Sequence, residues 1–410
     1  MMFGGVFTLT VTNKDIQDAR LRLADIIELT PLDFSHTLST LSNNQIYMKL
    51  ENLQLTGSFK IRGAYNKMAT LTAEEKAHGV VAASAGNHAQ GVAYAAKLMG
   101  APCTIVMPTV ASLSKVEATR RYGATIVLYG QTYDEAYAKA LDIQRETGGT
   151  YIHAFDDEKV IAGQGTIGME LLEQAPDLKA IVVPVGGGGL ISGIAIAAKS
   201  LRPDIRIIGV EANGAAAFKH SLAVGHIEEL NSVATIADGI AVKRPGALTF
   251  AAVSKYVDDV VLVEDEEIAR AMVVLIERSK IVSEGASAAV VAAAITGKLP
   301  FTGKKTALVL SGGNVDVLLL SRIIEHGLVA AGRHLRFVTT LPDRPGALVN
   351  LLTTLAETGA NIVSIEHHRL GQALGLGQVE VQLAAETRNW EHIEELKSKL
   401  HHSGYELLLR

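Results

Sequence analysis

The sequence has almost no cysteine from which a cross-link could be built. Cys103 is the only one in 410 residues, so no disulfide forms within the chain, and neither a cysteine zinc site nor a redox pair is available. Such usage fits a reducing compartment, and we expect a cytoplasmic protein. The first residues, MMFGGVFTLT, also lack the basic start and apolar run of a secretory signal.

A strong charge of either sign is absent as well. The formal net charge is −5 and the sequence has no long run of lysine or arginine, which argues against a nucleic-acid or anionic-membrane partner. Residues 180–198 form an uncharged stretch long enough to span a bilayer. Pro184 and four consecutive glycines interrupt it, so we expect a strand, a loop and a buried helix there. Small molecules are the expected partners.

Apolar, strand-like runs alternate with helix-like segments over more than three hundred residues. The strand-like runs are residues 80–84, 103–108, 125–130, 180–185, 205–212 and 306–314. This alternation predicts an α/β fold with a parallel sheet covered on both faces. Three of the strands run directly into the loops SAGNH, GGGGL and SGGN. Because ligands bind at the carboxyl ends of such strands, and helix N-termini attract anions, these loops predict a binding site.

The character of the sequence changes near residue 327. Residues 327–334 resemble a linker, and the remainder predicts the order strand, helix, strand, strand, helix, strand, which is the ferredoxin-like βαββαβ arrangement. The first helix has one apolar stripe, formed by Leu348, Leu351, Leu352 and Leu355. We therefore expect a core in residues 1–326 and a separate domain in residues 335–410.

Lys60 lies in the polar turn LTGSFKIRGA, between Phe59 and Ile61. It is either a solvated surface lysine or an amine whose pKa is lowered by burial so that it can react. The usual chemistry of a reactive lysine is a Schiff base with an aldehyde cofactor or a carbonyl substrate. Pyridoxal phosphate also needs a phosphate cradle, a partner for its ring nitrogen and a contact for its phenolic oxygen, which the three loops can supply.

Each loop has an alternative reading. The run Gly186–Gly189 either exposes backbone N–H groups to a phosphate or makes a tight turn. A nicotinamide cofactor would compete for the same loop, but Ser192 stands where G-x-G-x-x-G begun at Gly187 needs its last glycine. Asn87 and His88 could form a helix N-cap with a surface imidazole, and Ser311 could simply close a strand.

Six stretches together carry a resemblance to a known family. They are LTGSFKIRGA, SAGNHAQG, PVGGGGLISG, IADGIAVKRPG, SEGASAA and SGGNVD, and in this order they resemble the threonine and serine dehydratases of the fold-type II pyridoxal phosphate enzymes. The resemblance covers residues 15–325. It implies a two-domain, tryptophan synthase β-like core, with a large domain from residues 1–45 and 156–326, a small domain from residues 46–155, and the cofactor between them.

The resemblance also implies a role for each site residue. Lys60 would form the Schiff base with pyridoxal 5'-phosphate. The other cofactor contacts would be Phe59 beside the ring, Asn87 at the phenolic oxygen, Ser311 at the ring nitrogen, and Gly186, Gly187, Gly188, Gly189 and Leu190 around the phosphate. The substrate carboxylate would bind the loop of Ser84, Ala85, Gly86, Asn87 and His88.

A hydroxyl at the ring nitrogen leaves that nitrogen unprotonated and the ring a weaker electron sink, which favours β-elimination over transamination. With Lys60 as the base at Cα, the expected reactions convert L-threonine to 2-oxobutyrate and ammonia, and L-serine to pyruvate. A dehydratase that prefers serine or hydroxyaspartate is the alternative. A nicotinamide-dependent dehydrogenase and a non-catalytic amino-acid sensor are more remote alternatives.

The sequence departs from the related serine racemases at two positions. Their loop has a second serine as the opposite-face acid, where this chain has Ala85, so a purely racemising role is not expected. They bind a divalent cation through a carboxylate six residues after the glutamate that matches Glu211, where this chain has Ala217. We therefore expect no metal site.

The stretches TTLPDRPGALVNLL and GANIVSIEHH resemble the ACT domain, a βαββαβ module that binds amino acids at interfaces between copies. The resemblance implies effector contacts at Asp343, Arg344, Gly346 and Asn361, and a homodimer or homotetramer. One such domain after this core resembles the shorter regulated threonine dehydratases. Isoleucine is the expected effector because 2-oxobutyrate lies on the route to isoleucine; valine, another effector or an insensitive enzyme remain alternatives.

Overall fold

The computed structural model describes residues 10–369 and 375–409. Contacts divide the chain between Asp316 and Val317 into two compact units, the N-terminal unit (residues 1–316) and the C-terminal unit (residues 317–410). The extreme ends of the predicted domains, residues 1–9 and 410, lie outside the described residues.

The larger sheet of the N-terminal unit joins strands that are far apart in the sequence. Within the described residues its strand order is β1 (Leu32–Phe34), β2 (Gln45–Leu50), β10 (Lys305–Leu310), β7 (Ala180–Pro184), β8 (Arg206–Ala212) and β9 (Asp259–Val263). All neighbouring pairs are parallel except β1 and β2. The expected parallel arrangement is confirmed for these pairs. The antiparallel edge strand β1 was not predicted; it arises because the short helix α2 (His36–Ser42) returns the chain beside β1.

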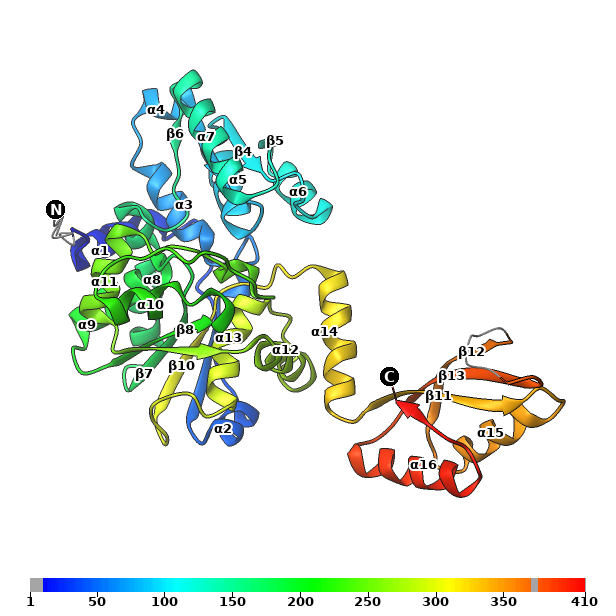
Figure 1. Ribbon diagram of the computed structural model, residues 1–410. Helices are drawn as coiled ribbons and strands as arrows, with labels where there is room; N and C mark the ends of the chain where they lie inside the picture. The colour runs from blue at the N-terminus through cyan, green and yellow to red at the C-terminus, as the bar shows by residue number, and fades with distance from the viewer. Residues whose placement is uncertain (1–9, 370–374, 410) are drawn as a thin grey trace. The chain divides into compact units, whose positions relative to one another are not determined.

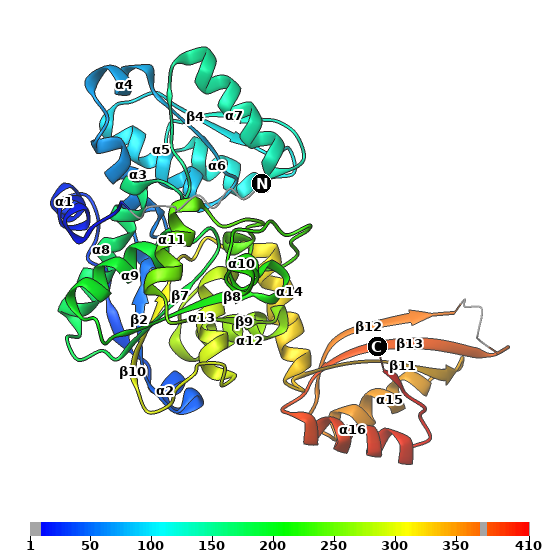
Figure 2. The same ribbon diagram turned by 60° about the vertical axis from the view of Figure 1, so that its left-hand side comes forward.

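The smaller sheet is wholly parallel. Its order is β5 (Thr125–Leu128), β4 (Cys103–Met107), β3 (Val80–Ala83) and β6 (Thr150–Tyr151). The associated helices are α3 (Lys60–Ala69), α4 (Ala73–His78), α5 (Asn87–Met99), α6 (Leu113–Arg120) and α7 (Tyr133–Thr147). Figures 1 and 2 both show this sheet and its helices as a lobe next to the larger sheet.

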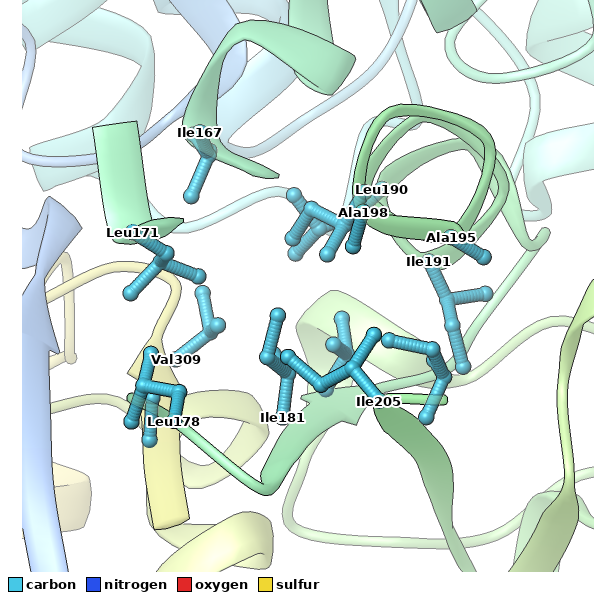
Figure 3. Close-up of a cluster of buried hydrophobic side chains, with 14 of the residues drawn as sticks. Ile167, Leu171, Leu178, Ile181, Leu190, Ile191, Ala195, Ala198, Ile205 and Val309 are labelled. Atoms are coloured by element: carbon cyan, nitrogen blue, oxygen red, sulfur yellow. The ribbon is translucent and has the colours of Figure 1, made fainter. Parts of the chain in front are cut away.

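Two long helices, α8 (Glu158–Gln174) and α9 (Gly189–Leu201), pack on each other and on the larger sheet. Figure 3 shows apolar side chains of these helices, among them Leu171 and Ile191, pointing toward Ile181 of β7 and Val309 of β10. Every residue of β7 is buried, as in a parallel sheet with both faces covered. The other α-helices of this unit are α1 (Asn13–Leu23), α10 (Ala217–Val224), α11 (Ala247–Tyr256), α12 (Asp265–Val274) and α13 (Gly285–Ile295). Three short 3₁₀ helices, η1 (Glu51–Leu53), η2 (Asn213–Ala215) and η3 (Asp238–Ile240), and one π-helix, η4 (Leu275–Ser279), complete it.

Residues 180–198 resolve into β7, a glycine turn and the buried helix α9, as predicted. Among the described residues, no helix is both long and apolar enough to cross a membrane.

The C-terminal unit has the predicted βαββαβ order. After α14 (Val317–Ala330) follow β11 (His334–Pro342), α15 (Ala347–Ala356), β12 (Asn361–His368), β13 (Gln378–Glu386), α16 (Trp390–His402) and β14 (Leu408–Leu409). In the described residues the sheet order is β12-β13-β11-β14, and all pairs are antiparallel. Leu351 and Leu355 are fully buried, and Leu348 and Leu352 pack against the same core, so the predicted apolar stripe is confirmed.

Two predicted boundaries need correction. Strand β2 pairs with β1 and β10 in the larger sheet, so the small domain cannot begin at residue 46. The expected linker, residues 327–334, contains the end of α14 and the first residue of β11. In the first case strand pairing, and in the second case continuation of helix α14, carries the structural element past the boundary that the local composition suggested. The division of the core into a large and a small domain stays a prediction.

Candidate active site

Lys60 is the first residue of α3, a helix that packs on α5 of the smaller lobe and on α8. Its Nζ donates a hydrogen bond to the carbonyl of Ala154 (3.0 Å) and lies 5.2 Å from the centroid of the Phe59 ring. Burial lowers the pKa of Lys60 to about 8, although the charge of Glu284 acts in the opposite direction. The structure therefore gives Lys60 the environment of a reactive amine rather than that of a solvated surface lysine.

The loop before Lys60 is bonded to the loop after β10. The backbone N–H of Phe59 donates to the carbonyl of Ser311 (3.1 Å). Ser311 is buried, and its Oγ lies 3.3 Å from Oγ of Ser287 in the first turn of α13. Oγ of Ser287 also accepts from the Gly312 N–H (2.6 Å). These bonds bring the predicted lysine and the predicted ring-nitrogen partner into one site.

The Asn87 amide is held from both sides. Its Nδ2 donates to the two carboxylate oxygens of Glu284 (2.7 and 2.9 Å), and its Oδ1 accepts from Nδ2 of Asn314 (2.7 Å). One N–H bond of the amide can be shared between the two carboxylate oxygens, which leaves the second N–H of Asn87 for a ligand oxygen. Burial raises the pKa of Glu284 to about 7, and the Asn87 bond opposes the rise. Glu284 and Asn314 lie inside the quoted motifs SEGASAA and SGGNVD, but no role was predicted for them.

The predicted carboxylate loop follows β3 directly. Within it the Gly86 N–H donates to Oγ of Ser84 (3.2 Å), and the space that a side chain at Gly86 would enter is open. His88 is buried, and burial lowers its pKa to about 3, so the ring is neutral and its Nε2–H donates to the Ile152 carbonyl (2.8 Å). His88 is therefore not a surface imidazole, and Ala85 contributes no hydroxyl.

The glycine run makes a tight turn from β7 into α9. A Cβ at Gly187 or Gly189 would overlap with Phe155, and a Cβ at Gly188, whose φ is +89°, would overlap with Phe218. Side chains are therefore excluded, and the loop presents bare backbone at a helix N-terminus, which suits an anion. The side chain of Leu190 lies in the apolar cluster of Figure 3, so only its backbone is available to a ligand.

A segment without a sequence-based prediction completes the site. Residues 152–157, here called the crossover segment, connect β6 to α8. The Ala154 carbonyl contacts Lys60, and the Phe155 ring packs on the glycine run. The only local signal was the polar run HAFDD directly after a strand-like stretch.

No group of three potential metal ligands among His, Cys, Asp and Glu occurs in the described part of the chain. Glu211, which matches the metal-binding glutamate of the racemases, instead accepts the backbone N–H groups of Phe218 and Lys219 (2.8 Å each).

The effector candidates fall into two groups within one chain. Asp343, Arg344 and Gly346 follow the C-terminal end of β11, whereas Asn361 opens β12 and donates to Glu386 (3.0 Å). Glu386 pairs with His334, at the opposite end of β11. The nine-residue strand β11 therefore separates the two groups by about 25 Å at the usual rise per residue.

Comparison with known proteins gives consistent matches. The family model for pyridoxal-phosphate dependent enzymes matches residues 23–312, and the ACT domain model matches residues 336–396. The L-threonine ammonia-lyase of Thermotoga maritima is 51% identical over 397 residues, which cover 97% of this chain and 99% of that protein. Among solved structures, the processed form of threonine deaminase isoform 2 from Solanum lycopersicum aligns with a TM-score of 0.73 and 40% identity over 76% of this chain and 92% of that one. Maize serine racemase aligns with a TM-score of 0.74 and 38% identity over 78% and 98%.

Proposed function

The chain belongs to the pyridoxal-phosphate dependent enzymes and carries an ACT domain, and from this premise we propose that it is a threonine ammonia-lyase. The reaction would convert L-threonine to 2-oxobutyrate and ammonia, and L-serine to pyruvate. The observation that carries this proposal is the meeting of Lys60, Asn87 and Ser311 in one site. The named activity of the Thermotoga relative, similar over nearly the whole chain, supports it.

The residues of this site fit pyridoxal phosphate. Lys60 is a half-buried amine whose pKa desolvation lowers to about 8, so it can react with an aldehyde. The glycine run, from which side chains are excluded, would hold the phosphate together with the backbone of Leu190. Asn87 would donate to the phenolic oxygen, and the Ser311 hydroxyl would meet the ring nitrogen, with Phe59 beside the ring.

Two groups of the protein, the Ser84–His88 loop and Lys60, would then orient the substrate and remove its Cα proton. Bound pyridoxal phosphate withdraws electrons from Cα of the amino acid. The backbone of the Ser84–His88 loop, open at Gly86, would bind the substrate carboxylate and orient the Cα–H bond. Lys60, whose lowered pKa leaves a fraction of the amine unprotonated near neutral pH, would accept the Cα proton.

Two alternatives separate clearly from this proposal. Family membership makes the nicotinamide-dependent dehydrogenase reading wrong. Similarity to maize serine racemase suggests racemisation as an alternative reaction. However, Ala85 has no hydroxyl that could return a proton to Cα on the face opposite Lys60. A serine- or hydroxyaspartate-preferring dehydratase would use the same residues, so substrate competition must decide between these lyases.

We also propose control by an amino acid, with isoleucine as the first effector to test. Asp343 and Asn361 lie at opposite ends of one sheet, so a site that contains both requires two copies of the chain. Strand β12, at the edge of this sheet, starts with Asn361. An isologous pairing of two copies would bring Asp343 of one near Asn361 of the other. This argument favours a homodimer or homotetramer, and the single cysteine favours a cytoplasmic location.

A keto-acid assay with L-threonine, L-serine and hydroxyaspartate tests the proposal, after an absorbance spectrum of each protein has been recorded. Wild type should show the visible cofactor band and form 2-oxobutyrate from threonine. Lys60→Ala should lose both, whereas the control Lys97→Ala, at an exposed site on α5, should keep both. A cofactor band without turnover of threonine would overturn the assigned substrate and leave the cofactor assignment intact.

A further inference from the structure

The crossover segment contacts three parts of the candidate site: Lys60, the carboxylate loop and the glycine run. The Ile152 carbonyl accepts from His88 of the carboxylate loop (2.8 Å), and the Ala154 carbonyl accepts from Nζ of Lys60 (3.0 Å). The ring of Phe155 packs on the glycine run, where it leaves no space for a Cβ at Gly187. A shift of this segment would therefore move contacts to the lysine and to the phosphate cradle at once.

His153 determines the shape of this segment. Its Nδ1 lies 3.2 Å from the backbone N of Phe155 and 2.8 Å from the backbone N of Asp156. Both neighbours are N–H donors, so Nδ1 carries no proton and accepts both bonds, and the neutral ring carries its hydrogen on Nε2. The imidazole also meets the Phe155 ring edge to face, with centroids 4.7 Å apart. The side chain thus folds the turn back on itself.

A second connection runs from the same turn to the glycine run. The Asp156 carboxylate accepts the N–H groups of Ala247, Leu248 and Thr249 at the start of α11 (2.9 to 3.2 Å). Oγ1 of Thr249 then donates to the carbonyl of Gly187 (2.7 Å). The turn is therefore joined to the phosphate cradle through Phe155 directly and through Asp156 and Thr249 indirectly.

We propose that His153 is a positioning residue for the cofactor site: its Nδ1, as a double acceptor, holds the Ala154 carbonyl against Lys60 and the Phe155 ring against the glycine run. The proposal rests on the proposed function only in taking pyridoxal phosphate as the cofactor. His153 does not need to touch substrate or cofactor. Its contribution is to keep the reactive amine and the phosphate cradle at a fixed separation.

The test compares two variants of similar size. In His153→Asn the Oδ1 atom, bonded to Cγ as Nδ1 is, can accept the same two N–H groups, whereas His153→Leu places a methyl group there. The dissociation constant of pyridoxal phosphate is measured by absorbance titration of the apoprotein. As a second measurement, borohydride reduction attaches bound pyridoxal phosphate to Lys60 permanently, and mass spectrometry of the peptide that contains Lys60 gives the fraction of protein that carries the cofactor. This measurement needs no substrate. Without these two hydrogen bonds, cofactor binding has to supply the ordering of the turn, which lowers the affinity by up to the strength of the two bonds, roughly 10- to 30-fold.

We expect His153→Leu to show this weakening and His153→Asn to remain within about threefold of wild type, a rescue that a merely space-filling histidine would not show. His220→Leu, at an exposed histidine paired with Glu228, is the control. If His153→Leu does not fold, His153→Gln, which moves the acceptor one bond further out, takes its place and should bind weakly. Wild-type affinity in His153→Leu, or equal weakening in the asparagine variant, would overturn the proposal. The expected pattern of affinities, together with no turnover of threonine by the wild-type protein, would count against the proposed function instead.

Discussion

Two desolvated titratable side chains, the half-buried Lys60 and the buried Glu284, set the charge of the candidate site. Burial lowers the pKa of Lys60 and raises the pKa of Glu284, and each charge stabilises the other. Asn87 lies against Glu284, so its orientation depends on a carboxylate that sequence reasoning did not single out. At this scale the site is a set of desolvated groups whose protonation states are linked.

Glu284 should make stability fall as the pH rises. Its pKa is about 7 in the folded protein and 4.5 without the fold, so between these values the folded state binds more protons and the free energy of unfolding decreases with pH. Glu284→Gln removes this contribution. We expect its melting temperature relative to wild type to rise from about pH 5 to about pH 8, measured by thermal unfolding of the apoproteins. Glu146→Gln, at an exposed site on α7, is the control, and parallel pH profiles for all three proteins would contradict the assignment.

At the scale of elements, the turn between β7 and α9 shows why glycine is needed in the candidate phosphate cradle. The left-handed backbone at Gly188 disfavours any side chain, and the ring of Phe218 fills the space beside it. The same turn continues into an apolar helix that packs in the core of Figure 3. Both flanks of the turn are thus buried.

Gly188→Ala should lose cofactor affinity by more than backbone strain alone explains. The control is Gly225→Ala, which has a similar φ of +78° but open space around a new Cβ. A left-handed alanine costs about 1 kcal/mol, so Gly225→Ala should lose about that much stability with unchanged affinity for pyridoxal phosphate. We expect at least a roughly tenfold weaker affinity for Gly188→Ala, because Phe218 or the turn must move. Equal affinities by absorbance titration would show that the turn is not part of the cradle.

On the scale of the whole molecule, a buried ion network joins the segment that carries Lys60 to the larger sheet. Arg62 of α3 donates to Glu51 (2.8 Å) and to Glu170 of α8, and Lys49 of β2 donates to Glu170 (2.6 Å). Both cations are fully buried, and two carboxylates balance their charge. Each member is needed because an unpaired buried charge is costly.

Arg62→Met should strongly destabilise the protein, because it leaves the Glu51 carboxylate buried without its guanidinium. Removal of one partner from such a network costs about 3–5 kcal/mol, and denaturant unfolding measures it. The matched control is Arg20→Met, which breaks an exposed pair with Glu173 and should cost less than about 1 kcal/mol. Similar losses in the two variants would mean that the network contributes no more than a surface pair.

The proposed effector site is formed by two copies of the chain, so variants of Asp343 and Asn361 should complement each other when their subunits are mixed. Asp343→Ala and Asn361→Ala should each lose the heat of isoleucine binding in calorimetry and keep their lyase activity. An equal mixture of the two, after subunit exchange, should recover part of the heat, because mixed pairs rebuild one intact site. Valine is titrated in parallel. If the wild-type protein gives no heat with either amino acid at millimolar concentration, the hypothesis of a branched-chain effector is wrong. If the mixture recovers no heat, the hypothesis of a site shared between two copies is wrong.

The sequence by itself determined the local features of this protein. Apolar runs such as VVAA and AIVVP became buried strands because their side chains need burial over their whole length. The turn chemistry of GGGGL and the apolar period of α15 are equally local. The positions of Lys60, Asn87 and Ser311 followed from motif resemblance, and the structure brings these three together; their roles stay a prediction.

Only the tertiary structure decided which distant groups meet. Strand β2 joins β10 across most of the chain, and Glu284 meets Asn87 from 197 residues away. The crossover segment contacts Lys60 from 94 residues away through a backbone carbonyl, which has no residue-type signature. Periodicity and turn propensity act over a few residues, whereas the partner of a buried polar group is set by the packing of whole elements. The supporting residues of the site therefore became visible only in the fold.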